Sequence, residues 1–467
     1  MENVKAPLEN LASFVAGLTW DALPQDVQQA AVYRVLDLVT VSVGASGNEL
    51  VEQMKKACKA MDPVPRTKGA TLWGEPEGEL WAPETAAMLN AMLAHTLELD
   101  DVHPSSKLHA SASLIPAAWS LAQMLGATGQ QLLTAVVAGY ETAFRIGMAF
   151  DVAAHRAQGW HVTATAGVFG AAAACGSLLG LDAQHMTWAL GLAGSQSAGV
   201  WAFLADGTNS KVLNPAHAAS AGMRAAFFAK YGMVGPEHIL EAKDGGLLNA
   251  MSNGGHIEKV DAGLGTSWEI LHMDMKPYPC CRSAHGTVDA LLRLRKDVTG
   301  GKDLTPEQIG ALVDHIDVGI YKIGYQQCAV SDGCLHPQNP MDAKFSLPYT
   351  GACALLYGTV DDSSFTTDKV ADPLLQSLLG KVHAVEDPEL TAQYPAHWSC
   401  KVDLVLQDGT HLETFVQDPS GSYRQPLSLE TAQNKAIGLL AHVYGDKARA
   451  KAVELLELAE KDGLPEI

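Results

Sequence analysis

The sequence TATAGVFGAAAACGSLL, residues 163–179, decides the fold class of this chain. It is apolar on nearly every face of a helix, which predicts a helix buried among other helices. Glycine or short polar loops divide other long Ala-rich runs of the same character, at residues 83–99, 110–125 and 130–151. No alternation of strands with these helices is visible, so a parallel α/β sheet is not expected here.

A different pattern follows in the second half of the chain. Residues 311–323 alternate apolar and polar positions and include β-branched side chains, which predicts a strand. Residues 400–406 and 410–416 flank Asp408-Gly409, a dipeptide typical of a tight hairpin turn. These strands indicate a small mixed α/β region.

The boundaries of this region follow from composition. A glycine-rich segment at residues 240–268 separates it from the helical part, and helices return after Ser428, a predicted N-cap, with Glu430 in the first turn. We therefore predict a mostly α protein, in which a large helical domain of two chain segments carries a smaller inserted α/β domain. The predicted domains are residues 1–268 and 418–467 for the helical part and 269–417 for the insertion.

Bulk properties exclude several classes of function. The 467 residues are 47% hydrophobic, enough for a large core, and the formal net charge of −20 argues against nucleic acid or anionic membrane as a partner. Residues 1–7 lack the order of a signal peptide, and no apolar run reaches about 18 residues, so we expect a cytoplasmic protein without membrane spans. The eight cysteines form no CxxC pair, which favours reduced, buried thiols.

Residues 97–109 hold the densest set of chemically active side chains. Three carboxylates, two histidines and a lysine follow directly after an apolar helical run. Glu98 and Asp101 share a helical face if the helix extends that far, and Pro104 then ends it. Such a set suits proton transfer beside a carboxylate or a metal site; helix-end carboxylates with surface histidines are an equally good interpretation from composition alone.

Two further clusters precede apolar helices. His161 follows Gly159-Trp160 and stands where it could meet an anion or simply cap the next helix. Lys211 lies in a polar loop before an Ala-rich helix, and taken alone it is best interpreted as a solvated lysine. Its apolar flanks make an anionic partner the alternative.

The segment at residues 274–285 is stiffened by two prolines. It presents Lys276, Tyr278 and Arg282 before a helix expected near Thr287, unless it is only a rigid connector with solvated charges. The adjacent Cys280 and Cys281 lack the spacing of a metal site and are better explained by packing.

Together these clusters supply cations and proton carriers for a small polycarboxylate. Removing a proton next to a carboxylate creates an enolate-like dianion, which cations must stabilise. A histidine or carboxylate transfers the proton, which contributes roughly 10²–10⁴ in rate.

Several of these motifs, in order, resemble the MmgE/PrpD family over residues 5–440. The resemblance rests on Asp100-Asp101 with His109, on Trp160-His161 and the run that follows, on Lys211, on the KPYPC segment from Lys276, and on the AKFSLPY segment with Lys344. Members include 2-methylcitrate dehydratase, cis-aconitate decarboxylase and iminodisuccinate epimerase. The resemblance implies a helical domain, an α/β lid, an active site between them, a homodimer and chemistry without cofactor or metal.

The resemblance also assigns residues. His109 and His161 match the family's catalytic histidines, Lys211 and Lys276 match its active-site lysines, and Glu98 stands where the family's aspartate begins an Asp-x-Asp-Asp run. The predicted catalytic set is His109, His161, Glu98, Asp101, Lys211 and Lys276. The predicted substrate-binding set is His103, Lys107, Tyr278, Arg282 and His285.

The leading hypothesis is a cofactor-independent lyase that dehydrates or decarboxylates a small di- or tricarboxylate. His161 or Glu98 would take the proton, His109 would act as the acid, and the lysines would hold the carboxylates. An epimerase or isomerase that returns the proton to the opposite face is the alternative. A metal-dependent hydrolase is disfavoured because no His-Asp dipeptide occurs, and an iron–sulfur site lacks the cysteine spacing. A binding protein with a decayed site would not retain both histidines and both lysines.

Overall fold

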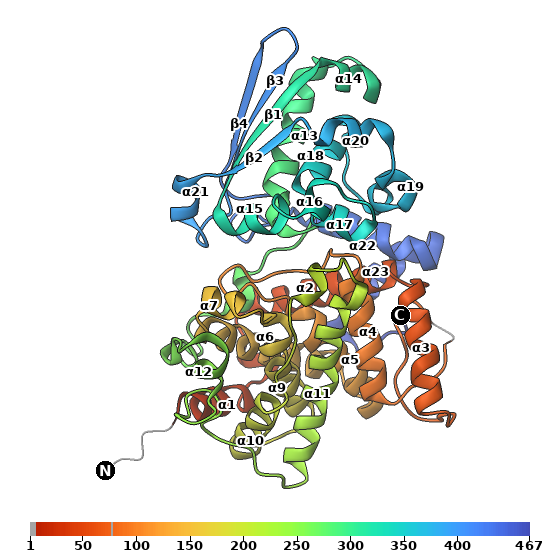
Figure 1. Cartoon of the computed structure of the whole chain (residues 1–467). Coiled ribbons are helices and arrows are strands. Elements are labelled where there is room, and N and C mark those ends of the chain that lie inside the picture. The colour runs from red at the N-terminus through yellow and green to blue at the C-terminus, as the bar shows by residue number, and fades with distance from the viewer. Residues whose placement is uncertain (1–5, 76–77) are drawn as a thin grey trace. The chain divides into compact units, whose positions relative to one another are not determined.

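The computed structural model describes residues 6–75 and 78–467, which form two compact units (Figure 1). The first unit comprises the described part of Met1–Thr96 with Asp100–Asp274 and Ser428–Ile467, and the second comprises Leu97–Leu99 and Met275–Leu427. Residues 1–5, which include most of the segment inspected for a targeting signal, lie outside the described residues. The predicted domain boundaries at residues 268 and 417 stay predictions.

Helices build the first unit. Its helices are α1 (Pro7–Ala16), α2 (Gln25–Gly44), α3 (Glu49–Met61), α4 (Pro83–Thr96), α5 (Ser111–Leu125), α6 (Gly129–Ala149), α7 (Val152–Ala157), α8 (Val162–Thr165), α9 (Gly167–Leu178), α10 (Ala183–Gly194), α11 (Leu213–Lys230), α12 (Leu247–Ser252), α22 (Leu429–Tyr444) and α23 (Ala448–Leu456). The prediction of a mostly α protein is confirmed.

Local sequence signals fix several helix ends. Thr128 and Gln131 form a reciprocal capping box at the start of α6, with hydrogen bonds of 3.2 and 2.9 Å. Gly126 ends α5 in the left-handed region at φ +67°, where a side chain is disfavoured. Ser428 caps α22 through its hydroxyl, which accepts a hydrogen bond from the Thr431 amide, as predicted.

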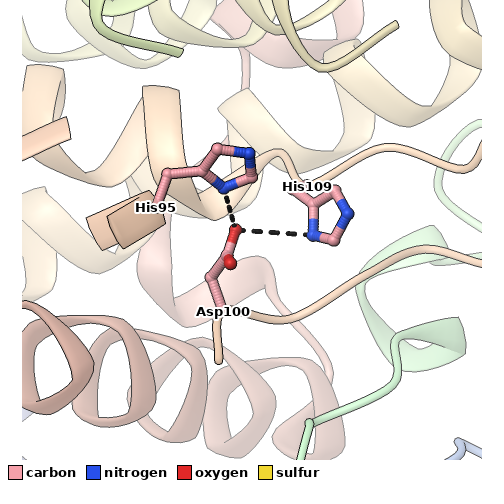
Figure 2. A group of neighbouring side chains, drawn as sticks. All are labelled: His95, Asp100 and His109. Atoms are coloured by element: carbon pink, nitrogen blue, oxygen red, sulfur yellow. Dashed lines mark hydrogen bonds and ion pairs between the residues drawn. The ribbon is translucent and has the colours of Figure 1, made fainter. Parts of the chain in front are cut away.

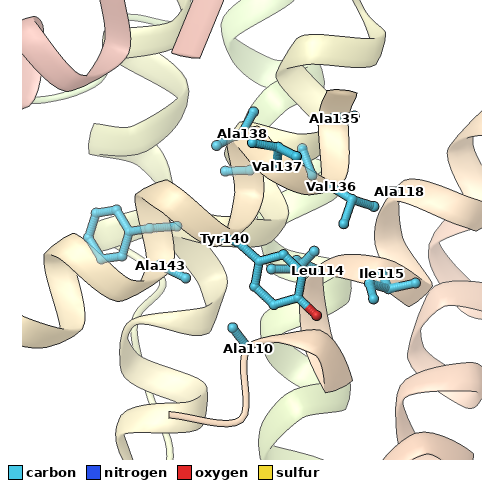
Figure 3. Packing of buried hydrophobic residues seen from close by; sticks show 14 of the residues in the cluster. Ala110, Leu114, Ile115, Ala118, Ala135, Val136, Val137, Ala138, Tyr140 and Ala143 are labelled. Atoms are coloured by element: carbon cyan, nitrogen blue, oxygen red, sulfur yellow. The ribbon is translucent and has the colours of Figure 1, made fainter. Parts of the chain in front are cut away.

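The core of the first unit is centred on α9, which contacts α5, α6, α10 and α11. Small residues let these helices approach closely, because a Cβ at Gly170 would lie 2.8 Å from the Ala143 methyl and 2.9 Å from the Gly139 carbonyl oxygen. Figure 3 shows Tyr140 packed among the alanines and leucines of α5 and α6. The predicted helix at residues 163–179 is interrupted at Ala166, where φ is −100°, and becomes α8 and α9.

The end of α4 corrects one expectation. The helix stops at Thr96, and Glu98 adopts a left-handed backbone with φ +58°. Glu98 and Asp101 therefore do not share a helical face. The prediction of a helix that continues to residue 99 or beyond, as far as Pro104, is wrong. The Thr96 hydroxyl donates to the Met92 carbonyl oxygen over 2.7 Å within the last turn.

The second unit combines helices with one mixed sheet. Its helices are α13 (His285–Thr299), α14 (Pro306–Leu312), α15 (Lys322–Cys328), α16 (Asp332–Leu335), α17 (Pro340–Lys344), α18 (Leu347–Tyr357), α19 (Thr367–Val370), α20 (Pro373–Leu379) and α21 (Pro388–Gln393). Its strands are β1 (Val313–Ile320), β2 (Val382–Glu386), β3 (Cys400–Leu406) and β4 (His411–Val416), in the order β2-β1-β3-β4.

The predicted strands near residue 313 and the predicted hairpin are confirmed. β3 and β4 pair antiparallel across the Asp408-Gly409 turn, where Gly409 has φ +83°, and β1 pairs antiparallel with β3. β2 was not predicted from the sequence; it pairs parallel with β1 from Ile316 opposite Val382 onward. α13 packs against β3 and β4 and also contacts α18.

All eight cysteines are buried, as predicted, and none of them forms a disulfide. In the described parts of the chain, no single helix is both long and apolar enough to cross a bilayer; α2 and α3 meet that requirement only when joined across a 90° bend.

Candidate active site

Three side chains of the first unit meet at the end of α4. The Asp100 carboxylate accepts from the Nδ1 of His95 over 2.8 Å, and the Nδ1 of His109 lies 3.4 Å from the same Oδ2 atom (Figure 2). His95 and Asp100 are fully buried, whereas 15% of the His109 side chain is exposed. His95 belongs to the last turn of α4, and the other two residues lie in the loop that leads to α5.

This group, called here the Asp100 triad, has the composition of a metal site. Its three ligand atoms all lie within 4.8 Å of one another. However, the Nδ1 of His109 also donates to the backbone carbonyl oxygen of Asp101 over 2.7 Å, and a ring nitrogen that carries a hydrogen does not bind metal. The contacts of the described residues therefore fit a hydrogen-bonded triad better than a metal centre.

The charge of Asp100 depends on its two histidines. Burial by itself raises the pKa of this carboxyl, but the charges and hydrogen bonds of His95 and His109 outweigh burial and hold the pKa well below its usual range. Asp100 is therefore an anion at neutral pH.

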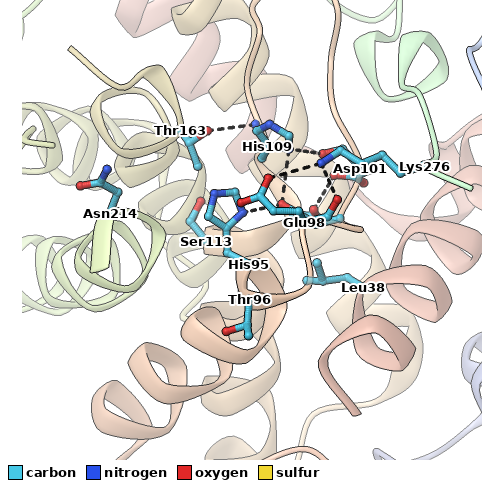
Figure 4. Close-up of polar contacts among 12 residues, drawn as sticks. Leu38, His95, Thr96, Glu98, Asp101, His109, Ser113, Thr163, Asn214 and Lys276 are labelled. Atoms are coloured by element: carbon cyan, nitrogen blue, oxygen red, sulfur yellow. Dashed lines mark hydrogen bonds and ion pairs between the residues drawn. The ribbon is translucent and has the colours of Figure 1, made fainter. Parts of the chain in front are cut away.

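His161 lies at the N-cap of α8 but does not cap it. Its Nδ1 is 2.9 Å from the Nδ2 of Asn214, which also donates to the Val200 carbonyl oxygen over 3.3 Å. Because Asn214 donates, Nδ1 is the acceptor and the hydrogen of a neutral ring is on Nε2. Burial and the positive charge of Lys211 lower the pKa of His161 well below its usual value, so the ring is neutral. Figure 4 shows Asn214 in this part of the first unit.

Both predicted lysines are buried. Lys211, in the short 3-10 helix Asn209–Val212, is 2% exposed, and Lys276 of the second unit is 1% exposed. The interpretation of either as a solvated surface charge is wrong. Lys276 donates to the Glu98 carbonyl oxygen over 2.8 Å and lies 3.8 Å from the Glu98 carboxylate, both in the second unit (Figure 4). Lys344 donates to the neighbouring Leu97 carbonyl oxygen over 3.0 Å.

Asp101 faces the core of the first unit. Its carboxyl accepts hydrogen bonds from the Ser111 hydroxyl and, over 3.1 Å, from the Tyr140 hydroxyl. Burial raises the pKa of Asp101 to about 7, which makes it a partly protonated group at neutral pH. It meets His109 through its backbone carbonyl rather than through its carboxyl.

His103 and Lys107 lie further along the same loop. Ring nitrogens of His103 contact the Ser106 hydroxyl at 2.8 Å and the Glu269 carboxylate at 3.2 Å, and its ring stacks on Phe144. Lys107 has a left-handed backbone at φ +57°, and burial lowers its pKa to about 8. The contacts of His103 support a loop-anchoring role, and its predicted substrate contact stays a prediction.

The remaining predicted residues lie together in the second unit. The Tyr278 hydroxyl donates to Asp289 over 2.7 Å. Arg282 donates to two backbone carbonyl oxygens near the end of the unit and lies 3.0 Å from the Nδ1 of His285, which is fully buried. These contacts hold the segment after Lys276 in place.

Sequence reasoning missed His95 and Asn214 and gave Asp100 no role. His95 lies within an apolar helical run, where a lone histidine is expected to be a core residue. Asn214 precedes a proline at the start of an Ala-rich helix and resembles an ordinary helix-start residue. One available signal was the spacing of His95 and Asp100, five residues apart across a helix end.

Comparison with known proteins places the chain in a family. The model of the MmgE/PrpD N-terminal domain matches residues 9–259, and that of the MmgE/PrpD C-terminal domain matches residues 278–459. The chain is 28% identical to a cis-aconitate decarboxylase-like protein, oryM, of Aspergillus oryzae, over 95% of this chain and 92% of the relative.

Two further relatives agree with this assignment. The cis-aconitate decarboxylase of Mus musculus is 27% identical over 92% of this chain and 86% of its own length. A 2-methylcitrate dehydratase of Cupriavidus necator is 36% identical over a shorter stretch, 19% of each chain. The domain models cover most of the sequence, and the chain belongs to the MmgE/PrpD family.

Proposed function

We propose that this protein is a lyase that acts on a small di- or tricarboxylate without a cofactor, by decarboxylation or dehydration through a carboxylate-stabilised carbanion. The observation that carries the proposal is that the first unit holds two different imidazoles. His109 lies beside the ionised Asp100 carboxylate, and His161 is neutral and lies near the buried Lys211. The names of the relatives, decarboxylases and a dehydratase, support the same reaction class.

The two histidines differ in what they can do. Asp100 favours the protonated ring of His109, which suits a proton donor. His161 is held neutral with its hydrogen on Nε2, which suits a hydrogen-bond donor to a substrate oxygen. In the proposed decarboxylation, a carbon–carboxylate bond breaks, carbon dioxide leaves, and the remaining electron pair on carbon takes the proton of His109.

The lysines have the anion-holding role. Lys211 and Lys276 are each buried, so a carboxylate that reaches them is attracted more strongly than it is in water. Glu98, bound to Lys276 in the second unit, is the proposed proton acceptor in the dehydration variant. The proposal also includes two expectations: a homodimer, which the family resemblance implies, and a cytoplasmic location, which the N-terminal sequence and the cysteines favour.

The test is proton NMR of the metal-stripped protein with a panel of acids in heavy water. The panel contains citrate, cis-aconitate, 2-methylcitrate, iminodisuccinate and malate. New vinyl signals, together with a loss of turnover in His161→Ala and Lys211→Ala, support the lyase. Deuterium that enters an alpha position without net loss of the acid indicates an epimerase instead. Turnover that is unchanged in both variants contradicts the site assignment.

A matched control separates chemistry from folding. His155 is another buried histidine of the first unit, and its ring contacts the Thr165 hydroxyl over 3.0 Å. His155→Gln removes a buried imidazole outside the proposed machinery and is expected to keep turnover.

A further inference from the structure

We propose that His95 and Asp100 are positioning residues: the buried Asp100 carboxylate, held by His95, fixes the orientation of His109 and balances the charge of its protonated ring. This inference rests on the proposed role of His109 as acid. Neither His95 nor Asp100 is needed to bind substrate in the proposed function.

The orientation of His109 is fixed from one side of its ring. Its Nδ1 faces both the Asp100 carboxylate at 3.4 Å and the Asp101 carbonyl oxygen at 2.7 Å. A carbonyl oxygen only accepts, so Nδ1 carries a hydrogen in every protonation state of the ring. Nε2 is therefore the atom of His109 that exchanges a proton, and the partial exposure of this side chain gives it access.

The orientation of Asp100 is fixed in turn by His95. His95 Nδ1 and Asp100 Oδ2 are 2.8 Å apart, a charge-assisted hydrogen-bond distance between two fully buried groups. The rings of His95 and His109 meet edge-on with centroids 5.3 Å apart. His95 therefore holds in place the same carboxylate oxygen that faces His109, and it does so from a fully buried position.

Charge balance gives His95 a second role. A buried carboxylate with no cation beside it is costly, and a triad with one protonated ring is neutral overall. When His109 passes its Nε2 proton to the substrate carbon, Asp100 loses that compensation. His95 keeps its hydrogen bond to the same carboxylate through this step, which limits the cost of the buried charge.

The proton count closes without any further reactant. One proton leaves His109 Nε2 for the substrate carbon, Nδ1 keeps its hydrogen, and Nε2 regains a proton from solvent after product leaves. The Nε2–H bond of His109 is the bond that breaks and re-forms, and the contacts of Asp100 with His95 and with His109 Nδ1 persist through the cycle.

The experiment compares Asp100→Asn and His95→Gln with the wild type and with the His155→Gln control. We expect Asp100→Asn to lower kcat roughly 10²–10⁴-fold and His95→Gln about tenfold, with little change in KM. The pH limb of kcat that reports the acid should move to lower pH in Asp100→Asn, since the imidazolium of His109 loses its counter-charge. His95→Gln keeps that counter-charge, so its effect is read in kcat and in the His109 signal described next. A residue with only a structural role would not shift this limb.

A second measurement works without turnover. Proton–nitrogen NMR of histidine-labelled protein should show two downfield Nδ1–H signals. Both should move upfield in Asp100→Asn, where His109 keeps only the Asp101 carbonyl oxygen as acceptor; in His95→Gln the His95 signal should be lost and the His109 signal shifted. If wild type accepts none of the acids, the proposed function fails while these signals still test the triad. Unchanged kcat and unchanged signals overturn the inference. Stoichiometric zinc in the purified wild type, lost in His95→Gln, also overturns it, in favour of a metal centre.

Discussion

Asp100 and Asp317 each lie between two histidines, Asp100 in a buried cluster and Asp317 in an exposed one. Asp100 lies between His95 and His109 in the first unit, and Asp317 lies between His315 and His383 on the sheet of the second unit, at 3.5 and 3.3 Å. The buried side chains are 0–15% exposed and those of the sheet 32–56%.

Solvent decides what the same residue types do in the two places. Hydrogen bonding to Asp314 raises the pKa of His315, with Asp317 adding a smaller Coulombic contribution, which is the behaviour of a screened surface pair. Around Asp100 the low dielectric strengthens the pairing and makes any missing partner costly. The two groups have the same composition, so composition alone does not distinguish a candidate active site from a surface cluster. Burial of the charged side chains around Asp100 is what distinguishes it.

The largest expected difference is in stability. Asp100→Ala should lower the free energy of unfolding by about 3–5 kcal/mol, because it breaks a buried charge pair. Asp317→Ala should leave the urea midpoint unchanged, since its contacts are open to water. Urea denaturation followed by tryptophan fluorescence measures both, and equal effects of the two variants would remove the basis of the comparison.

A second, smaller effect concerns pH. Asp101 has a pKa raised by burial to about 7, so its stabilising form is the protonated one. That contribution is complete below the unfolded pKa near 3.9 and is lost as pH rises through about 7. Asp101→Asn should flatten the dependence of stability on pH between about 4 and 7. A slope that persists in this variant would assign it to another buried group, with Glu141 the first to examine.

The histidines themselves sharpen the comparison by NMR titration. His161 should stay neutral well below pH 6.5, because burial and Lys211 lower its pKa. His315 should titrate above pH 6.5, and the stability that its pairing gives is present below that pH and lost as pH rises through its raised pKa. Titration of His161 near pH 6.5 would mean that its site is hydrated.

The smallest effect is that of salt. Raising ionic strength from 0.05 to about 0.5 M should move the pKa of His315 back toward its usual value, since exposed pairs are screened within about a Debye length. The downfield Nδ1–H signals of the Asp100 triad should not change. A salt-sensitive triad would indicate that water reaches Asp100.

The sequence predicted the parts of the fold that depend on local patterns. The Asp408-Gly409 hairpin and the Ser428 cap were correct because turn and cap chemistry act over four or five residues. β2 was missed because four of its five residues are exposed or half-buried and its alternation is weak. Its pairing partner, β1, lies far away in the sequence.

For the candidate site the sequence indicated residue types but not their contacts. Lys211 and Lys276 resembled solvated lysines, because burial of a charge depends on elements that fold around it. His95 resembled a core residue because it lies in an apolar helical run. Its contact with Asp100 depends on the left-handed backbone at Glu98, which local sequence patterns do not predict. The roles of the predicted residues stay predictions until the variants are measured.

The assignment of Leu97–Leu99 to the second unit has a consequence for recombination. These three residues interrupt the first unit in the chain, yet Lys276 and Lys344 bind their carbonyl oxygens. A chimera that takes only residues 275–427 from a relative would combine the relative's residues at positions 276 and 344 with residues 97–99 of this chain. Exchange of the complete second unit of this chain therefore requires two crossovers that flank residues 97–99, in addition to the two that flank residues 275–427.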